Sequence, residues 1–519
     1  MRSRAWRLFA ALIFALPAFA SPLLGAPSAA AEPVPDAAAI RAKVRAAVGD
    51  LPEAYRETDE TTTSTGTTTV EHDYRLGKDL RFTFDTGRFH SERGVFRAAA
   101  WHMNDNGQVV MDQPDPGQAA PEHFTTTVTA IHAPVEGYLI ATLNARGYGT
   151  KEYVDGAAWQ YVRRERIGGS GTVVTTYDDV RLDHGRTFAH HVHVENGIAR
   201  TTSDLRILEY APGGVDASEV AIPKPRRALV EFPPGAASAE LPAQFGRSHV
   251  YVRVLIGGRG LDFVLDSGAS GITIDRGVAR ELGLPEFDKH SAVTAGRYET
   301  ARTIVPEMRI GQLVMRDVAV QEVPQGWNTA QGVKEVGLLG FDFLAELGVT
   351  IDYEHQRVTV VPSAQYVPPN DPHTIPIDVR IGNGQPLATV ALNGAIGERW
   401  ILDTGGAGTF LIFDYFARRH PEALHDSVAG FPRRPLQIHG IGGEVPAQAY
   451  QIESLRLGNV NFANFVGYLV PPGSAYAQSA DGVVGTEFLK LFTVGFDYGN
   501  SRVYLVPNRD GRTAMGIKS

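Results

Sequence analysis

The first half of the chain alternates between polar and apolar residues. Between about residues 60 and 210, segments such as LRFTFDTG and GTVVTTYDDVRL change character at every second position, and turns such as NDNG and NG separate them. This period of two is typical of antiparallel strands with one buried and one wet face. The pattern predicts an antiparallel β-sheet domain over residues 32–210. Its first element is a helix in DAAAIRAKVRAAVG (residues 36–49), where apolar residues recur at helical spacing.

The composition changes after residue 210. Proline, glycine and alanine crowd between residues 211 and 246, which is typical of a linker. Beyond it, in FVLDSGASGITI (residues 263–274), an apolar run leads into an aspartate and the chain then turns on glycine. One such motif says little in a chain with 55 glycines.

The rest of the chain contains a second copy of that motif, because the C-terminal half is internally repeated. FVLDSGASGITI is matched by WILDTGGAGTFL (residues 400–411), MRIGQLVMRDVAVQEVP (308–324) by LRLGNVNFANFVGYLVP (455–471), and GLLGFDFLAELGVTIDYEHQRVTVVP (337–362) by GVVGTEFLKLFTVGFDYGNSRVYLVP (482–507). The matched pieces come in the same order, so two copies of one domain stand in tandem. We expect lobe 1 at residues 247–365 and lobe 2 at residues 372–509.

Each copy resembles a lobe of the retropepsin-like (pepsin-clan) bacterial aspartyl protease family. In that family an apolar strand leads into Asp-Ser/Thr-Gly, a glycine-tipped flap hairpin follows, and two apolar residues and a glycine then open onto a short helix. Lobe 1 has Asp266-Ser267-Gly268 and Leu338-Leu339-Gly340, and lobe 2 has Asp403-Thr404-Gly405 and Val483-Val484-Gly485. The resemblance covers roughly residues 247–509. It implies a mainly β protein in which two closed β-barrel lobes form one bilobal aspartic protease.

The resemblance also assigns the site residues. It implies that Asp266 and Asp403 are the catalytic residues and that their neighbours support the dyad. It places the flaps at TAGRYET (residues 294–300) and IHGIGGEVPA (residues 438–447). The expected supporting residues are Ser267, Gly268, Thr404 and Gly405, and the expected flap residues are Gly296, Tyr298, Gly440, Ile441, Gly442 and Gly443.

Acid–base chemistry explains why two copies are needed. Two carboxyl groups about 3 Å apart cannot both ionise, so they share one proton, and one can activate water while the other polarises a peptide carbonyl. The hydroxyls of Ser267 and Thr404 can form hydrogen bonds across the pseudo-twofold axis, and Gly268 and Gly405 allow close backbone approach. Since each copy brings one aspartate, a monomer can hold a complete site. Pairing between two chains is the alternative.

Composition removes several other classes of function. The formal net charge is −9 and there is no basic block, which argues against a nucleic-acid partner. The chain has no cysteine, which excludes disulfides, thiol catalysis and zinc–cysteine sites. We expect no cofactor and no metal, and a peptide or protein substrate as the partner.

The first 31 residues predict an export signal. Three arginines in MRSRAWR precede the apolar run LFAALIFALPAFA, and small residues follow. A membrane anchor is the alternative, but the run is short and contains a proline, and no later stretch is apolar enough to span a membrane. The sequence therefore predicts a periplasmic or secreted protein without a stable membrane span.

The sheet domain is similar to the periplasmic lipoprotein-carrier family. The similarity rests on strand rhythm and on DGAAWQYV, YDDVRLDHG and NGIARTTSDL, and it implies a curved sheet around a hydrophobic cavity. A sheet domain without a lipid role is the alternative.

The predicted function is an aspartic endopeptidase, and two other interpretations stay open. One is a catalytically inactive protease fold that binds peptides, and the other is a lipid or lipoprotein carrier with a protease-like appendage. The sequence departs from the family pattern at Gly406, where alanine or serine is usual.

Several further motifs have a structural interpretation. We read Asp85-Thr86-Gly87 as a hairpin turn, and Asp352 and Asp497 as turn or salt-bridge residues. We read the histidines of HHVH as exposed strand residues, with a metal pair at His191 and His193 as the alternative.

Overall fold

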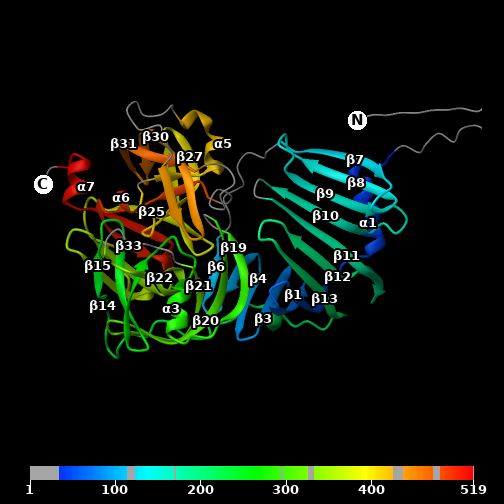
Figure 1. Cartoon of the computed structure of the whole chain (residues 1–519), viewed down its shortest axis with the longest axis horizontal. Helices are drawn as coiled ribbons and strands as arrows, with labels where there is room; N and C mark the ends of the chain where they lie inside the picture. The colour runs from blue at the N-terminus through cyan, green and yellow to red at the C-terminus, as the bar shows by residue number, and fades with distance from the viewer. Residues whose placement is uncertain are drawn as a thin grey trace, which may run out of the picture.

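The computed structural model describes residues 34–113, 123–168, 171–293, 296–324, 332–408, 410–424, 436–470 and 480–517. The predicted export signal lies outside these residues. The described chain is mainly β, which confirms the predicted fold class. Figure 1 shows an N-terminal sheet on the right and the two repeated regions on the left, lobe 1 in green and lobe 2 in yellow to red.

The N-terminal region is one antiparallel sheet of 13 strands. Its strands are β1 (Ala54–Thr63), β2 (Thr68–Leu76), β3 (Asp79–Thr86), β4 (Phe89–Phe96), β5 (Ala99–Met103), β6 (Val109–Asp112), β7 (Thr125–Ile131), β8 (Gly137–Leu143), β9 (Gly149–Asp155), β10 (Tyr161–Gly168), β11 (Gly171–Asp183), β12 (Arg186–Asn196) and β13 (Thr201–Pro212). Strands β1 and β13 pair in the middle, so the sheet ends at β6 on one edge and at β7 on the other.

Helix α1 (Ala37–Val48) covers one face of this sheet near the β7 edge. The Asp36 side chain caps it by accepting from the Ala39 N–H at 2.7 Å. The buried side chains of Ile40 and Val44 pack against the sheet, and Arg41 Nη2 forms an ion pair with Glu152 Oε2 at 2.5 Å. The helix therefore covers the apolar side chains of Ile140 and Val154 at this end of the sheet.

The segment expected as a linker is partly ordered and packed. It contains α2 (Ala217–Val220), β14 (Ala239–Glu240) and β15 (Ala243–Phe245). Val220, Leu229 and Leu241 within it are at most 3% exposed. The segment therefore contributes apolar surface to the core instead of only spanning a gap.

Lobe 1 is a closed barrel with a flap hairpin. Its further elements are β16 (Val250–Ile256), β17 (Arg259–Leu265), β18 (Ile272–Asp275), α3 (Arg276–Glu281), β19 (Phe287–Val293), β20 (Arg297–Ile310), β21 (Leu313–Val323), β22 (Glu335–Leu339), α4 (Phe341–Leu344), β23 (Leu347–Asp352) and β24 (Arg357–Pro362), with a 3₁₀ turn at Ser363–Gln365. Pairing of β16 with β20 closes the barrel.

Lobe 2 repeats this order of elements. It contains β25 (Ile375–Gly382), β26 (Gln385–Leu392), β27 (Ala395–Leu402), β28 (Phe410–Ile412), α5 (Asp414–Arg419), β29 (Leu436–Gly440), β30 (Gly443–Leu457), β31 (Val460–Leu469), β32 (Gly482–Val484), α6 (Thr486–Leu489), β33 (Phe492–Asp497), β34 (Arg502–Pro507) and α7 (Arg509–Ala514), with 3₁₀ turns at Pro421–Ala423 and Tyr498–Asn500. Here β26 pairs with β30 as β16 pairs with β20 in lobe 1.

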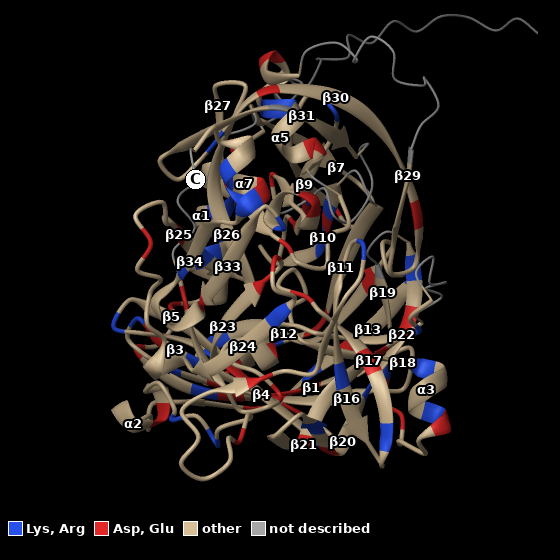
Figure 2. Ribbon diagram, turned by 90° about the vertical axis from the view of Figure 1, so that its left-hand side faces the viewer, with Lys and Arg blue, Asp and Glu red and all other residues tan. Residues whose placement is uncertain are grey.

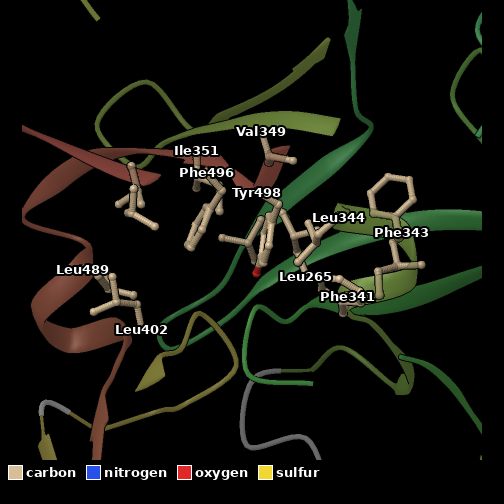
Figure 3. Packing of buried hydrophobic residues seen from close by; sticks show 14 of the residues in the cluster. Leu265, Phe341, Phe343, Leu344, Val349, Ile351, Leu402, Leu489, Phe496 and Tyr498 are labelled. Atoms are coloured by element: carbon tan, nitrogen blue, oxygen red, sulfur yellow. The ribbon is translucent and has the colours of Figure 1, made fainter. Parts of the chain in front are cut away.

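A shared sheet joins the two lobes. Strand β23 of lobe 1 pairs antiparallel with β33 of lobe 2, from Gly348 opposite Asp497 to Asp352 opposite Thr493. One continuous apolar core packs against this sheet and includes Leu265 and Leu402, the residues just before the two aspartates (Figure 3). The two aspartate loops are thus anchored in the same core.

The N-terminal sheet contacts lobe 1 through the turns at one end of its strands. Phe89 packs edge to face on Phe287 with ring centroids 6.0 Å apart. The Arg302 guanidinium lies 4.2 Å from the Phe89 ring centroid and forms an ion pair with Asp105 at 2.7 Å. These contacts place β4 and the β5–β6 turn next to β19 and β20, in the region where the sheet meets lobe 1 in Figure 1.

Charges of both signs are interspersed over the side of the molecule that Figure 2 shows. No single-sign surface of the kind that attracts nucleic acid stands out in that view. Across the described residues, no helix combines the length and the apolar character needed to cross a membrane.

Phe488 provides a test of the lobe 2 core. Its side chain is fully buried and packs edge to face on Phe462 at 5.0 Å. Phe488→Ala should lower the free energy of unfolding by about 3–5 kcal/mol, because it leaves a cavity among aromatic rings. Urea unfolding measures the change. Leu182→Ala is the control, since Leu182 is 72% exposed and should change stability by less than about 0.5 kcal/mol. Equal effects of the two changes would contradict the described packing.

Candidate active site

Asp266 and Asp403 each follow the end of a buried strand. The Asp266 N–H donates to the Leu339 carbonyl of β22, which runs parallel to β17, at 3.0 Å. The Asp403 N–H donates to the Val484 carbonyl of β32 in the same way, also at 3.0 Å. Both carboxyl groups are therefore held by strands in the barrel cores, which limits their movement.

The residues after the aspartates bind the two loops to each other. The Ser267 N–H donates to Thr404 Oγ1 and the Thr404 N–H donates to Ser267 Oγ, both at 3.0 Å. The Ser267 hydroxyl donates to the Leu402 carbonyl and the Thr404 hydroxyl to the Leu265 carbonyl, both at 2.7 Å. Each hydroxyl thus accepts one bond from the other lobe and donates one to it, and both residues are 1% exposed.

Gly268 and Gly405 stand where side chains would not fit. A Cβ atom on Gly268 would lie 2.5 Å from Asp403 Cγ, and one on Gly405 would lie 2.4 Å from Asp266 Cγ. Each glycine N–H also donates to the preceding aspartate at 2.8 Å, Gly268 to Asp266 Oδ1 and Gly405 to Asp403 Oδ1. Only glycine lets the loops approach closely enough to bring the two carboxyl groups together.

The two carboxyl groups share a buried environment. Burial raises the pKa of Asp266 well above its ordinary value, and the charge of Asp403 and a hydrogen bond to Asp403 raise it further. Burial also raises the pKa of Asp403, although the N–H groups of Gly405 and Gly406 and the bond from Asp266 oppose this. The pair therefore favours a state with one proton between two carboxyls.

Two buried tyrosines belong to this environment, and the sequence analysis did not identify them. Burial raises the pKa of Tyr498 well above its ordinary value, and Asp266 and Asp403 add to the shift. Burial and Asp403 act in the same way on the pKa of Tyr353. Neither hydroxyl has a hydrogen-bond partner among the described residues. In Figure 3 the Tyr498 ring lies between Phe496 and Leu265. The signal was present in the repeat, which carries Asp-Tyr twice.

The tips of the two flap hairpins meet. A Cβ atom on Gly296 would lie 1.9 Å from the Gly442 carbonyl oxygen, and one on Gly442 would lie 2.8 Å from Tyr298 Cδ1. Gly440 pairs with Gly443 at the end of the β29–β30 hairpin. Gly442 and Gly443 have positive φ values of 86° and 153°, which favour glycine.

The lobe 2 flap tip crosses to lobe 1. Ile441 packs against a buried cluster of Tyr251, Val264, Val333 and Leu338, and Ala269, three residues after Asp266, packs against the same cluster. This apolar contact holds the flap down beside the lobe 1 aspartate loop.

A polar group stands next to this cluster and was also not predicted. Glu335 accepts from the Tyr251 hydroxyl at 2.7 Å and pairs with His249 Nδ1 at 3.1 Å. His249 Nε2 is buried and has no partner among the described residues. The lobe 1 side of the site therefore contains a buried ring nitrogen without a hydrogen-bond partner in the described part of the chain.

The other motifs lie apart from the two aspartates in the fold. Asp85 lies near the end of β3, just before the turn that begins at Gly87, and pairs with His90 at 2.7 Å. His191 and His193 both bind Asp204, at 3.1 and 2.9 Å, and His190 binds Asp183. Within the described ranges, no group of three or more histidine, cysteine, aspartate or glutamate residues could hold a metal ion.

The remaining motif residues have local roles. Asp352 accepts from the His355 N–H at 3.0 Å, and Asp497 accepts from the Asn500 N–H at 3.2 Å, so both stabilise turns. A Cβ atom at Gly406 would lie 3.0 Å from Asp403 Oδ2. The space that alanine or serine would fill is therefore narrow in this chain.

A family model matches part of lobe 1. Residues 252–343 match the model described as "Aspartyl protease". This range contains Asp266 and lies within lobe 1. No curated protein matches the chain.

Solved structures resemble different parts of the chain at low identity. The aspartic proteinase from Irpex lacteus is 13% identical, with a TM-score of 0.34, and the match covers 54% of this chain and 100% of that one. The LolA superfamily protein NE2245 from Nitrosomonas europaea is 11% identical, with a TM-score of 0.29, covering 36% and 97%. A putative outer membrane lipoprotein-sorting protein domain from Vibrio parahaemolyticus is 9% identical, with a TM-score of 0.27, covering 35% and 94%.

Thr404→Val tests the bonds between the loops. The substitution keeps the shape of the side chain but removes the hydroxyl that binds the Ser267 N–H and the Leu265 carbonyl. The free energy of unfolding should therefore fall by about 1–3 kcal/mol. Thr303→Val is the matched control, because Thr303 is fully buried and its hydroxyl has no partner among the described residues. Urea unfolding should show no loss for the control. A Thr404→Val protein as stable as the control would contradict the role of these bonds.

Asp266→Asn tests the shared proton through stability. A carboxyl whose folded pKa lies above its unfolded pKa stabilises the folded state fully below the unfolded value and loses that contribution as pH rises. The parent should therefore lose stability as pH rises above about 3.8, up to the raised folded pKa. The Asp266→Asn protein should lose less stability than the parent over the same pH range, because it lacks the Asp266 carboxyl. Parallel stability curves from pH 3 to pH 8 would contradict the shift.

Proposed function

We propose that the protein is an aspartic endopeptidase. The observation that carries the proposal is the pair of buried carboxyls, Asp266 and Asp403, held face to face by reciprocal bonds between Ser267 and Thr404. Such a pair is costly for stability, because buried carboxyls repel and lose hydration. Costly groups of this kind are concentrated at catalytic sites.

The reaction needs one proton on the pair. The ionised carboxylate takes a proton from water while the water oxygen bonds to the peptide carbonyl carbon, and the protonated carboxyl gives its proton to the carbonyl oxygen. In the next step the first carboxyl protonates the amide nitrogen and the other takes back a hydroxyl proton as the C–N bond breaks. The products are an acid and an amine, and the dyad again holds one proton.

The flaps suit an extended peptide. Gly296 and Gly442 bring backbone, not side chains, to the meeting point of the two tips, so the backbone groups there can pair with a peptide strand. A substrate must separate Ile441 from the lobe 1 cluster on entry, and closure afterwards excludes water.

The carrier interpretation receives less support from the sheet. Four carboxylates stand opposite each other on the face that α1 partly covers, in the register pairs Glu57 with Asp73 and Asp59 with Glu71. Burial raises the pKa of Asp59 to about 7 and of Asp73 to about 8. Polar groups of this kind are costly against a lipid chain.

The setting proposed for the activity is an exported monomer. Both lobes stand in one chain and share a sheet through β23 and β33, so no second copy is needed to bring the aspartates together. The N-terminal sequence supports periplasmic or secreted export, and the proposed reaction uses no metal or cofactor.

Cleavage of a mixed peptide library between pH 3 and pH 8 tests the function. Asp266→Asn and Asp403→Asn should each lower kcat/KM by about 10²–10⁴-fold, since each removes half of one acid–base pair. Asp85→Asn is the control, because it alters the third Asp-Thr-Gly of the chain, which lies outside the site. Loss in only one of the two variants would refute the pairing. No cleavage by the folded parent would favour the peptide-binding alternative.

A further inference from the structure

The turn between β5 and β6 reaches from the N-terminal sheet to the lobe 1 helix α4. Asn104 Nδ2 donates to Asp342 Oδ1 at 2.8 Å, and Asn106 Nδ2 donates to Asp342 Oδ2 at 3.0 Å. Gln108 Nε2 donates to the Asp342 carbonyl at 2.9 Å and to Glu346 Oε1 at 3.0 Å. Both oxygens of one carboxyl are thus bound by amides of another domain.

The turn is built for this contact. The Asn104 side chain bonds to Gln108 twice, accepting from its N–H at 3.0 Å and donating to Oε1 at 2.8 Å. Asn106 exchanges two bonds with Ala319 of β21, and Asn106 and Gln108 are 4% and 5% exposed. Asn106 and Gln108 are buried amides whose side-chain hydrogen bonds go to lobe 1 or to the turn itself, which indicates a fixed joint between the two domains.

Asp342 in turn touches the loop that carries Asp266. It accepts a bond from the Ile272 N–H, and a Cβ atom on Gly271 would lie 3.1 Å from Asp342 Oδ2. The Phe341 N–H donates to the Ala269 carbonyl at 2.9 Å. Both ends of the segment from Ala269 to Ile272 are therefore held by α4, and α4 is held by the turn.

Lobe 2 lacks this arrangement. The repeat places Glu487 where lobe 1 has Asp342, and Glu487 pairs with Lys490 of its own lobe. Thr486 instead fastens the lobe 2 loop from within, donating to the Thr404 carbonyl at 2.9 Å. In lobe 1 the corresponding residue is Phe341, which has no hydroxyl. Lobe 2 thus holds its aspartate loop with the Thr486 hydroxyl, whereas lobe 1 holds its loop through Asp342 and the amides of the N-terminal sheet.

We infer that Asn104 and Asn106, acting through Asp342, are positioning residues for Asp266, so that the N-terminal sheet is part of the proteolytic unit. This inference rests on the proposed function. The sheet holds α4, α4 holds the segment after Asp266, and the Asp266 carboxyl then meets Asp403 at the correct distance. Loss of the joint lets the lobe 1 loop shift while lobe 2 stays fixed.

The test compares two matched turns in the full chain. Asn144 opens the β8–β9 turn as Asn104 opens the β5–β6 turn, and it accepts from the Tyr148 N–H at 2.9 Å as Asn104 accepts from Gln108. Asn104→Ala combined with Asn106→Ala should lower kcat by about 10–100-fold with little change in KM, since a small displacement of a catalytic group has this effect. Asn144→Ala should leave both constants unchanged.

A merely structural role predicts a different result. Among the described residues, the titratable groups that act on Asp266 or its partner include Asp403, Tyr498, Tyr353 and His249, and Asp342 lies behind the loop. Displacement of Asp266 among them should shift the pH profile of kcat/KM in the double variant. Lower stability in urea with unchanged kcat and an unchanged pH profile would overturn the inference.

Two further measurements keep the test decisive. If the double variant does not fold, Asp342→Asn takes its place. This substitution keeps the size of the side chain and removes the charge that the Asn104 and Asn106 amides bind. An Asp342→Asn protein with the kcat and the pH profile of the parent would overturn the inference. If the folded parent cleaves no peptide, the proposed function fails, and ¹³C NMR titration of the Asp266 carboxyl then decides. A shifted titration in the variant supports positioning, and an unshifted one refutes it.

Discussion

Two carboxyl groups buried side by side are the constraint on which the rest of the structure depends. Without a cation between them, Asp266 and Asp403 stay together only if they share a proton and if the backbone around them cannot relax. The paired bonds of Ser267 and Thr404, the two glycines against the carboxyls and the strands that end at each aspartate all serve this requirement. The surrounding apolar core sets the low polarity that makes the proton sharing strong.

The repeat is nearly symmetric at the dyad and asymmetric around it. Each loop is fastened to its own barrel, but lobe 2 uses the Thr486 hydroxyl, whereas lobe 1 uses Asp342 and amides from the N-terminal sheet. Gln385 of lobe 2 adds a bond to the Gly268 carbonyl at 2.5 Å. The lobe 1 loop is therefore supported from both neighbouring domains. The two lobes therefore share the geometry around the aspartates and differ in the contacts outside it.

Much of the fold could be predicted from the sequence, because it depends on local patterns of apolar and polar residues. Alternation predicted the N-terminal sheet, and helical spacing over residues 36–49 predicted α1 (Ala37–Val48). The β-barrel fold followed from the resemblance of the motif around each aspartate to a known family. The joint between the β5–β6 turn and α4 could not be predicted in this way. NDNG reads as an ordinary turn, and nothing local says that its amides bind a carboxyl more than 200 residues later. His249 was missed for the same reason, since its place beside Glu335 depends on long-range packing, whereas the repeated Asp-Tyr pair marked Tyr353 and Tyr498 without indicating their burial beside the aspartates.

The most direct test of the central claim is a ¹³C NMR titration of the aspartate carboxyls, with Asp266 and Asp403 assigned by substitution. Sharing of one proton predicts two coupled steps in the parent, one of them well above the ordinary range of aspartate, and a single step for the remaining carboxyl in Asp266→Asn or Asp403→Asn. Two independent steps near the ordinary pKa of aspartate, each unaffected by substitution of the other residue, would contradict the account.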